Sequence, residues 1–388
     1  MGYQRVARRF ATISTFSLLY LSSSIFVPPT NAQSTTDRKP GTKSAGRLRS
    51  LAEEALYQRK YTEAVAYYKE ACELEPENAV NYYHLFKVHT RMRRNMDAIS
   101  DLDRAVELDP SKLSYRDERA KLLVSVGQCE QAVEEYRVIA SKDSEKLDQN
   151  AAQNAQNCAI QISKSTDAYL RKDFQSVLVH VNAAVVYADQ SIDLNFMKSE
   201  AYYHVGDYYG AISETGGILK LKSSHLDAYK IRGDSYYRMG EYDLAINHYR
   251  EALKLDPEHK GCKASHKRVK SIRKKDKKGD TAAASNEHKE AISLWNQAIQ
   301  IDTDNVTYRR AAFKKMIKSY GAMGDHRNAI EHAEVIVATG ADLDAYFVLG
   351  DAQLDGELYN ESIQTYRKAV DIAVSFKTRA SSMLVSYS

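Results

Sequence analysis

The feature that most constrains the fold is an internal repeat with a period of about 34 residues. In each copy a small residue is followed four positions later by a larger, often aromatic one, and three positions after that by another small or apolar one. The clearest copy is Ala245, Tyr249 and Ala252, closed by Pro257, and it lies one period after Ala211. The other copies begin at Ala64, Ala98, Ala132, Val177, Ala291, Ala329 and Ser362. Each unit of such a chain packs on its neighbours, so we expect a linear array.

The residue types within one copy predict a pair of antiparallel helices. Small residues stand where two helix backbones approach closely, and the large residue fills the space beside them. Pro257 follows the second helix, where its missing N–H and fixed φ prevent the helix from continuing. Gly240 marks the turn between the two helices. This is the tetratricopeptide-repeat pattern, and it predicts an all-α superhelical solenoid.

Nine copies can be counted, and two of the spacings between them exceed the period by about a third. The extra residues fall at Ser141–Ser165 and at His259–Lys278, and both read as lengthened connecting helices. We therefore predict three blocks of three repeats. Their boundaries are 45–145 for repeats 1–3, 146–258 for repeats 4–6 with a long entry helix, and 259–373 for a basic connecting helix and repeats 7–9, followed by an irregular tail at 374–388.

The N-terminus has the three-part layout of a secretory signal peptide. Arginines at positions 5, 8 and 9 precede an uncharged stretch from Ala11 to Val27, and small residues follow at Thr30 and Ala32. We expect cleavage after Ala32 and a disordered linker at 33–44. A membrane anchor is the alternative, but the stretch is short and diluted by Ser and Thr; a mitochondrial transit peptide fits less well. No later segment is expected to span a bilayer.

The charge balance argues against nucleic acid as a partner. Without residues 1–32 the chain has 52 basic and 51 acidic residues, so its basic isoelectric point partly reflects the leader. The basic run Lys267–Lys278 has no aromatic residues interleaved for base stacking. We interpret it as a solvated helix and loop.

Four cysteines and two glycosylation sequons gain meaning if the chain enters the secretory pathway. No two cysteines have the C-x-x-C spacing of a zinc site or redox motif. One or two disulfides are possible in an oxidising lumen, and the pairing stays open. The cysteines are Cys72, Cys129, Cys158 and Cys262, and the candidate glycosylated residues are Asn305 and Asn360.

Enzymatic activity has little support in the sequence. There is no Gly-rich phosphate loop, no His-Glu-x-x-His and no Gly-x-Ser-x-Gly. The histidines that we considered as ligands are spread over separate predicted helices without metal-ligand spacing. We therefore predict a protein that is not an enzyme and that uses no metal or cofactor.

Signal peptide, nine repeats and breaks after the third and sixth together resemble the lumenal J-domain co-chaperones of the DnaJ subfamily C member 3 type. The resemblance covers about Leu48 to Ala373 and is most specific at Leu253–Cys262, where the sixth repeat runs into the basic helix that contains Lys267–Lys270. It implies a protein of the endoplasmic-reticulum lumen, active in the unfolded-protein response, that binds unfolded or misfolded polypeptides and passes them to the lumenal Hsp70. It also implies a link to inhibition of protein kinases that act on a translation initiation factor.

One departure from that family is large. Its J domain carries a His-Pro-Asp triplet that stimulates Hsp70, and the 388 residues contain no such triplet. The sequence is either a relative without a J domain or an incomplete version of a longer protein, and we favour the second. We expect the chain as given to hold a client and to engage Hsp70 only indirectly.

Many cytosolic repeats of this class bind the acidic tails of Hsp70 or Hsp90 through a two-carboxylate clamp of Lys and Asn side chains. The corresponding positions of repeats 1–3 hold Arg49, Glu53, His84, Ser114 and Glu118. Glu53 would repel a carboxylate and both asparagines are missing, so the clamp is not expected here.

First-helix residues that do not pack between helices are instead expected to line a groove for extended apolar polypeptide. These candidates are Leu56, Tyr57, Val80, Tyr83, Lys87, Lys121 and Val124. The alternative for Leu56 and Val124 is ordinary packing between helices. Three hypotheses remain: a lumenal client-binding co-chaperone, a scaffold for a defined folded partner, and a kinase-inhibitory regulator.

Overall fold

The structure is a computed structural model that describes residues 44–386. Within these residues the chain forms 18 α-helices and one short 3-10 helix, and it contains no β-strand. The prediction of an all-α fold is confirmed. The expected signal peptide at 1–32, its cleavage after Ala32 and all but the last residue of the expected linker lie outside the described residues.

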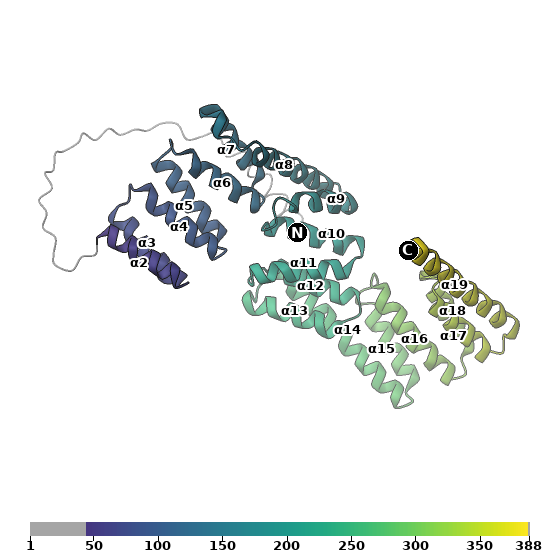
Figure 1. The fold of residues 1–388 in the computed structure, drawn as a ribbon. Coiled ribbons are helices and arrows are strands. Elements are labelled where there is room, and N and C mark those ends of the chain that lie inside the picture. Colours follow the sequence, from purple (N-terminus) through teal and green to yellow (C-terminus); the bar gives the residue numbers. More distant parts are fainter. Residues whose placement is uncertain (1–43, 387–388) are drawn as a thin grey trace, which may run out of the picture. The chain divides into compact units, whose positions relative to one another are not determined.

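The described helices group into two compact units, divided between Val205 and Gly206. In the first unit neighbouring helices pack in succession along the chain (Figure 1). Its helices are α2 (Ala45–Tyr57), α3 (Tyr61–Leu74), α4 (Ala79–Arg91), α5 (Asn95–Leu108), α6 (Leu113–Ser125), α7 (Cys129–Lys142), α8 (Gln149–Leu170), α9 (Phe174–Val185) and α10 (Ile192–Val205), with the 3-10 helix at Ser144–Lys146.

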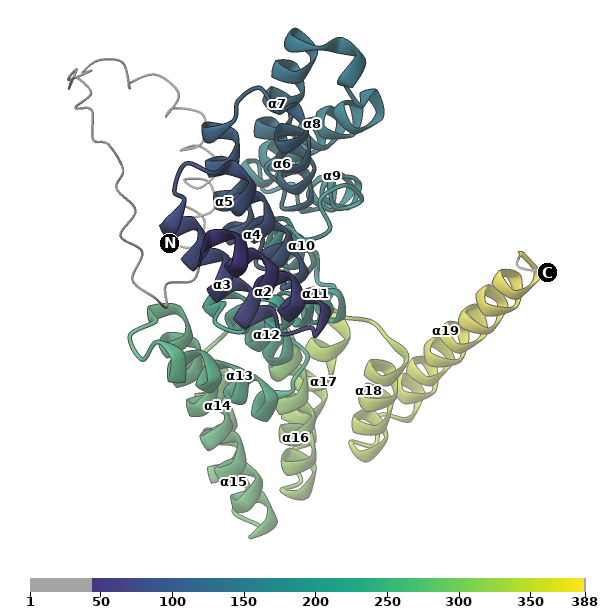
Figure 2. The same cartoon turned by 60° about the vertical axis from the view of Figure 1, so that its left-hand side comes forward.

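The second unit continues the same pairing. Its helices are α11 (Tyr208–Leu221), α12 (Leu226–Arg238), α13 (Tyr242–Leu255), α14 (Lys260–Ala284), α15 (His288–Ile299), α16 (Val306–Ala322), α17 (His326–Thr339), α18 (Leu343–Asp355) and α19 (Tyr359–Ser386). Figure 2 shows α19 running on beyond its partner α18. The irregular tail predicted at 374–388 is therefore wrong as far as Ser386, because that stretch has no Gly or Pro to end the helix.

The turns inside the described helix pairs share one backbone feature, a residue in the left-handed region. The φ angle at this position is +87° at Gly240 and +59° at Arg59. A left-handed residue reverses the chain in few residues, and glycine adopts it without steric cost. The nine positions are Arg59, Arg93, Gly127, Lys172, Gly206, Gly240, Asn286, Gly324 and Glu357. Eight of these turns join two helices that pack together within one unit, and Gly206 lies at the division between the units.

Within a pair, the sizes of two facing side chains complement each other. A Cβ added to Gly279 of α14 would lie 2.6 Å from Nε1 of Trp295, which α15 buries at 2% exposure. In the next repeat the first helix carries the larger residue and the second helix the smaller one. Ile317 of α16 packs against the cluster that contains Ala333 of α17. Two further pairs repeat the first arrangement, Gly233 with Tyr249 and Gly350 with Tyr366. Small and large residues thus alternate to keep the helices close.

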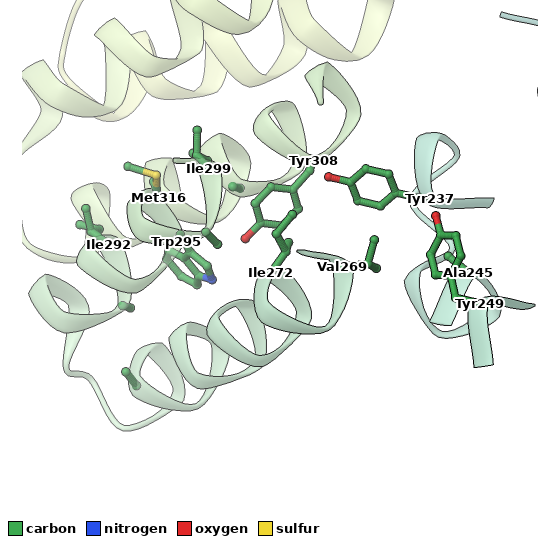
Figure 3. Close-up of a cluster of buried hydrophobic side chains, with 14 residues drawn as sticks. Tyr237, Ala245, Tyr249, Val269, Ile272, Ile292, Trp295, Ile299, Tyr308 and Met316 are labelled. Carbon is green, nitrogen blue, oxygen red and sulfur yellow. The ribbon is translucent and has the colours of Figure 1, made fainter. Parts of the chain in front are cut away.

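The two long repeat spacings are occupied by long helices, α8 with 22 residues and α14 with 25. Val269 and Ile272 of α14 are fully buried and belong to the same hydrophobic cluster as Trp295 and Tyr308 (Figure 3). The basic segment is therefore a structural helix with an apolar side. The division into three blocks at 146 and 259 stays a prediction.

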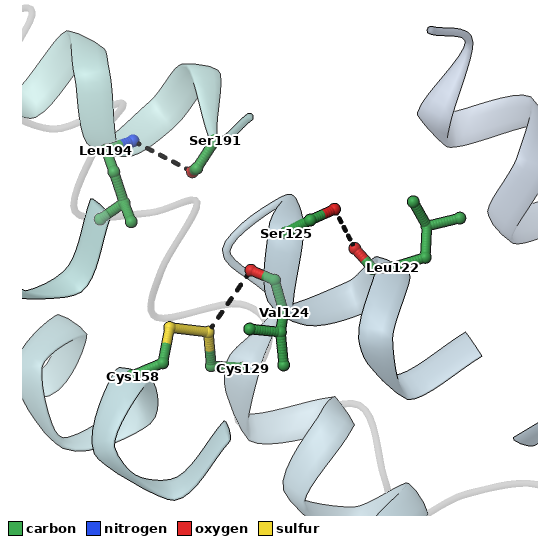
Figure 4. Close-up of a disulfide and its surroundings, with 7 residues drawn as sticks. All are labelled: Leu122, Val124, Ser125, Cys129, Cys158, Ser191 and Leu194. Carbon is green, nitrogen blue, oxygen red and sulfur yellow. Dashed lines mark hydrogen bonds between the residues drawn. A yellow bond between two sulfur atoms is a disulfide. The ribbon is translucent and has the colours of Figure 1, made fainter. Parts of the chain in front are cut away.

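A disulfide joins α7 to α8 through Cys129 and Cys158 (Figure 4). Both cysteines are buried, and Sγ of Cys129 lies 3.8 Å from the carbonyl oxygen of Val124. The sequence alone leaves this pairing open. Cys72 and Cys262 are free and buried, and burial raises the pKa of the Cys72 thiol to about 11.

A buried histidine–aspartate pair lies inside the second repeat. His89 of α4 and Asp101 of α5 are 2.6 Å apart, from Nδ1 to Oδ2, and both are nearly inaccessible to solvent. Burial raises the pKa of Asp101 to about 6, although the histidine opposes the rise. The carboxylate form is favoured by His89 and, more weakly, by the charge of Lys69.

Candidate functional site

A cavity of about 720 Å³ lies beside α4 and α6 in the first unit. One wall is formed by residues 75–80 at the entrance to α4. The other is formed at the entrance to α6 by Leu108, Asp109, Lys112 and Tyr115. Glu75 and Asp109 hold the same place in consecutive repeats, one period apart. The cavity is therefore a product of the repeat, made where two successive connections face each other.

Aromatic and cationic side chains form one continuous group beside this cavity. The ring of Tyr83 lies 4.7 Å from the ring of Tyr115 and 5.6 Å from that of Phe86, centroid to centroid. Nζ of Lys87 lies 4.4 Å from the centroid of Tyr83, and Nζ of Lys112 lies 4.6 Å from that of Tyr115. Such pairs orient the rings and hold the ammonium groups above them.

The structure brings three of the predicted groove residues together. Val80 is 41% exposed and lines the cavity, while Tyr83 and Lys87 follow it on the same side of α4. We name Val80, Tyr83, Lys87 and Lys112, together with the buried Tyr115 that contacts Tyr83, the α4–α6 surface. It offers an exposed aliphatic group, partly exposed aromatic carbon and the long stems of two lysines.

The other predicted residues lie elsewhere. Leu56 packs on the core of the first repeat, and Val124 packs between two buried clusters, so both follow the alternative reading as interhelix packing residues. Tyr57 stands alone at the end of α2, where it is 92% exposed. Lys121 is exposed, and its Nζ donates to Oδ2 of Asp117 at 2.8 Å.

Two members of the α4–α6 surface were missed by sequence reasoning, Lys112 and Tyr115. Nζ of Lys112 also donates to the Tyr115 hydroxyl at 3.1 Å. Their position could have indicated them. Lys112 and Tyr115 lie within five residues after Pro110, at the entrance to a first helix, and Val80 lies four residues after Pro76.

Two acidic side chains on the rim of the cavity form hydrogen bonds with neighbouring side chains. Nη1 of Arg49 donates to Oε2 of Glu75 at 2.6 Å, and this hydrogen bond is the main reason why the pKa of Glu75 is lowered. The hydroxyl of Ser111 similarly lowers the pKa of Asp109. Both groups therefore remain carboxylates at neutral pH, which disfavours an acidic ligand in this cavity.

Two residues at the positions of the two-carboxylate clamp make contacts within the protein instead. Arg49 is engaged by Glu75 and by Oδ1 of Asn81, 2.9 Å away. The ring of His84 stacks on Tyr68 with 5.4 Å between centroids, and burial lowers its pKa. Arg49 and His84 therefore do not supply the free cations that the clamp requires.

The two sequons differ sharply in accessibility. Asn305 is 1% exposed, and its Oδ1 accepts from the backbone N–H of Tyr308 at 3.0 Å, so it caps α16. A glycan on this buried amide is incompatible with the fold, so the candidate site at Asn305 is corrected. Asn360 is exposed and stays a predicted glycosylation site.

No cluster of three metal-ligating side chains occurs in the part of the chain that the structure describes. None of the described helices combines the length and apolar character needed to cross a bilayer.

The fold and its turns define the class of the protein, a tetratricopeptide-repeat solenoid. The family description "Tetratricopeptide repeat" matches at residues 50–78, 226–259 and 315–374. The crystal structure of the P58(IPK) TPR domain has the same fold, with a TM-score of 0.63 over 84% of this chain and 92% of that chain at 22% identity.

The resemblance to the DnaJ subfamily C member 3 proteins is confirmed by comparison with curated relatives. DnaJ homolog subfamily C member 3 of Gallus gallus is 24% identical over 312 residues, which cover 79% of this chain and 62% of the relative. DnaJ protein P58IPK homolog B of Oryza sativa subsp. japonica is 27% identical over 354 residues, covering 91% of this chain and 66% of the relative. The chain thus spans about two thirds or less of the length of these relatives.

Proposed function

We propose that this chain is a co-chaperone-type repeat protein that holds unfolded or misfolded polypeptides on the α4–α6 surface. The observation that carries the proposal is the cavity of about 720 Å³ beside Val80 and the Tyr83–Tyr115 pair. Solenoid grooves bind extended segments, and aromatic carbon with lysine stems contacts apolar side chains without a fixed sequence.

The proposed compartment is the endoplasmic-reticulum lumen, within the unfolded-protein response. The Cys129–Cys158 disulfide supports this part of the proposal, because structural disulfides form and persist in oxidising compartments. The similarity to DnaJ homolog subfamily C member 3 proteins supports a co-chaperone role. The lumenal Hsp70 is proposed as an indirect partner, to which the held polypeptides are passed.

The test is suppression of aggregation of several unrelated, chemically denatured proteins, followed by light scattering. We expect the purified chain to suppress aggregation and Val80→Asp to weaken suppression by about fivefold in the concentration required, because a carboxylate would enter an acidic cavity. Val335→Asp is the matched control, since Val335 lies on α17 of the second unit and is 39% exposed.

Equal loss in both variants would show that the α4–α6 surface is not the binding surface. Failure of the chain to bind any denatured protein, together with capture of one defined folded partner, would favour the scaffold hypothesis. Val80 is exposed, so its replacement should leave the helical circular dichroism unchanged.

A further inference from the structure

One side of α14 carries a row of exposed lysines. Lys263, Lys267, Lys270, Lys274 and Lys277 follow one another at alternating steps of four and three residues, so they share one face of the helix. The row spans about 21 Å along the helix axis at the usual rise per residue. The opposite face carries the buried Val269 and Ile272, and these hold α14 in the core.

The charged side chains of α14 differ in whether they form ion pairs. Arg268 pairs with Asp302 at 3.7 Å, and Arg273 pairs with Asp243 at 3.1 Å. In contrast, Lys267, Lys270, Lys274 and Lys277 form no ion pair within the described part of the chain. Like charges at such spacings repel one another by a few tenths of a kcal/mol per pair, so this row does not stabilise the helix.

The lysine row borders a groove rather than a flat surface. A cavity of about 300 Å³ separates α13 from α14, with Ile246, Asn247 and Arg250 on one wall. The other wall is formed by Lys270, Arg273, Lys274 and Lys277. The groove thus has five cations against one acid, Asp243, which Arg273 already neutralises.

We propose that the α13–α14 groove binds an acidic, extended segment of a partner polypeptide. Charge complementarity selects carboxylates, and the row of about 21 Å matches roughly six residues of extended chain. Ile246 and the lysine stems supply apolar contact at the base, while Asn247 can bond to a peptide backbone. The site lies entirely within the second unit and is independent of the proposed client surface on α4 and α6.

Two other anionic partners fit the walls of the groove less well. No aromatic side chain lines the groove, so nothing there would stack on the bases of single-stranded nucleic acid. A membrane surface would meet the lysine tips but would leave the half-buried Ile246 unused. Both serve as competing probes in the test.

The experiment measures fluorescence anisotropy of a labelled oligo-glutamate peptide titrated with the full chain. We expect binding that weakens steeply between roughly 50 and 300 mM salt. The double variant Lys270→Glu, Lys274→Glu should raise the Kd about tenfold. The matched control Arg367→Glu, Lys368→Glu changes the net charge equally on exposed residues of α19 and should leave the Kd within about twofold.

Three outcomes would overturn the proposal. They are the absence of peptide binding at low salt, an equal loss in both double variants, and stronger binding to a DNA oligonucleotide or to phosphatidylserine-rich vesicles than to the peptide. The same variants are assayed for suppression of aggregation, which should not change. The two proposals therefore fail separately.

Discussion

Replacement of Gly279 by alanine tests the close packing that builds each repeat. Gly279 lies in α14 and faces Trp295, the single tryptophan of the chain. The new Cβ would lie 2.6 Å from Nε1, whereas ordinary contact begins at 3.4 Å, so the ring or the helix must move by about 0.8 Å. Trp295 is 2% exposed and cannot swing into solvent without leaving the core.

Two opposing free energies decide the outcome. Alanine favours a helix interior over glycine by about 1 kcal/mol. Overpacking a dense core costs about 1 to 3 kcal/mol, because neighbouring side chains leave their preferred rotamers. We therefore expect Gly279→Ala to lower the free energy of unfolding by about 1 kcal/mol.

Gly321 provides the matched control. It lies near the end of α16, and a Cβ added there meets nothing within 4 Å. Gly321→Ala should raise the free energy of unfolding by up to about 1 kcal/mol, so the two variants should differ in sign. Urea unfolding followed by Trp295 fluorescence reports on the seventh repeat directly, which matters because repeat arrays need not unfold in one step.

Stabilisation by Gly279→Ala of the same size as by Gly321→Ala would refute the packing argument. A double variant separates strain from other causes. Trp295→Phe should cost about 1 kcal/mol less in the Gly279→Ala background than in the native one, because the smaller ring relieves the contact. Circular dichroism follows this pair, since the fluorophore is gone.

Three further predictions follow from the described contacts. Replacing Cys129 and Cys158 by serine, or reducing their disulfide, should lower the free energy of unfolding by about 3 to 4 kcal/mol for a loop of 29 residues, measured by urea unfolding. Because burial raises the pKa of Asp101 to about 6, the fold favours its protonated form. The stability that folding gains from the protonated Asp101 is fully present below the unfolded pKa of 3.8 and is lost as the pH rises through about 6. Over this range the free energy of unfolding of the wild type should fall by about 1 to 3 kcal/mol relative to that of Asp101→Asn. A pH-independent difference would contradict this assignment. In a secreted preparation, Asn360→Gln should remove a glycan seen by mass spectrometry, whereas Asn305 should carry none.

The repeat was predictable because its determinants are local in the sequence. Small and large residues at fixed spacings specify which helix faces meet, and each pair contacts mainly the next one. The left-handed turn residue was predictable at Gly240, where glycine permits it, but not at Arg59 or Lys172. There the surrounding helices impose the conformation on residues that adopt it only at a cost in free energy.

The candidate site was less predictable, because the spacing that marks a first-helix position does not say how deep the side chain lies. Leu56 and Val124 occupy groove-type positions, yet both pack, partly buried, against clusters of core residues. Tyr115 is 1% exposed and would not be chosen as a surface residue, although its ring holds Tyr83 in place. Contacts between successive repeats decide how deeply these side chains are buried. The pattern within a single repeat does not specify those contacts.

Two different surfaces of the repeat scaffold carry opposite charge. Before α4 and α6, carboxylates that Arg49 and Ser111 keep ionised surround the cavity next to Tyr115. Between α13 and α14, lysines without an ion pair among the described residues line the α13–α14 groove. Packing fixes only the residues that touch between helices, so the outward positions are free to carry either charge. A ligand with both apolar and acidic segments would therefore be recognised by charge as well as by apolar contact, and Val80→Asp and Lys270→Glu should weaken different parts of it.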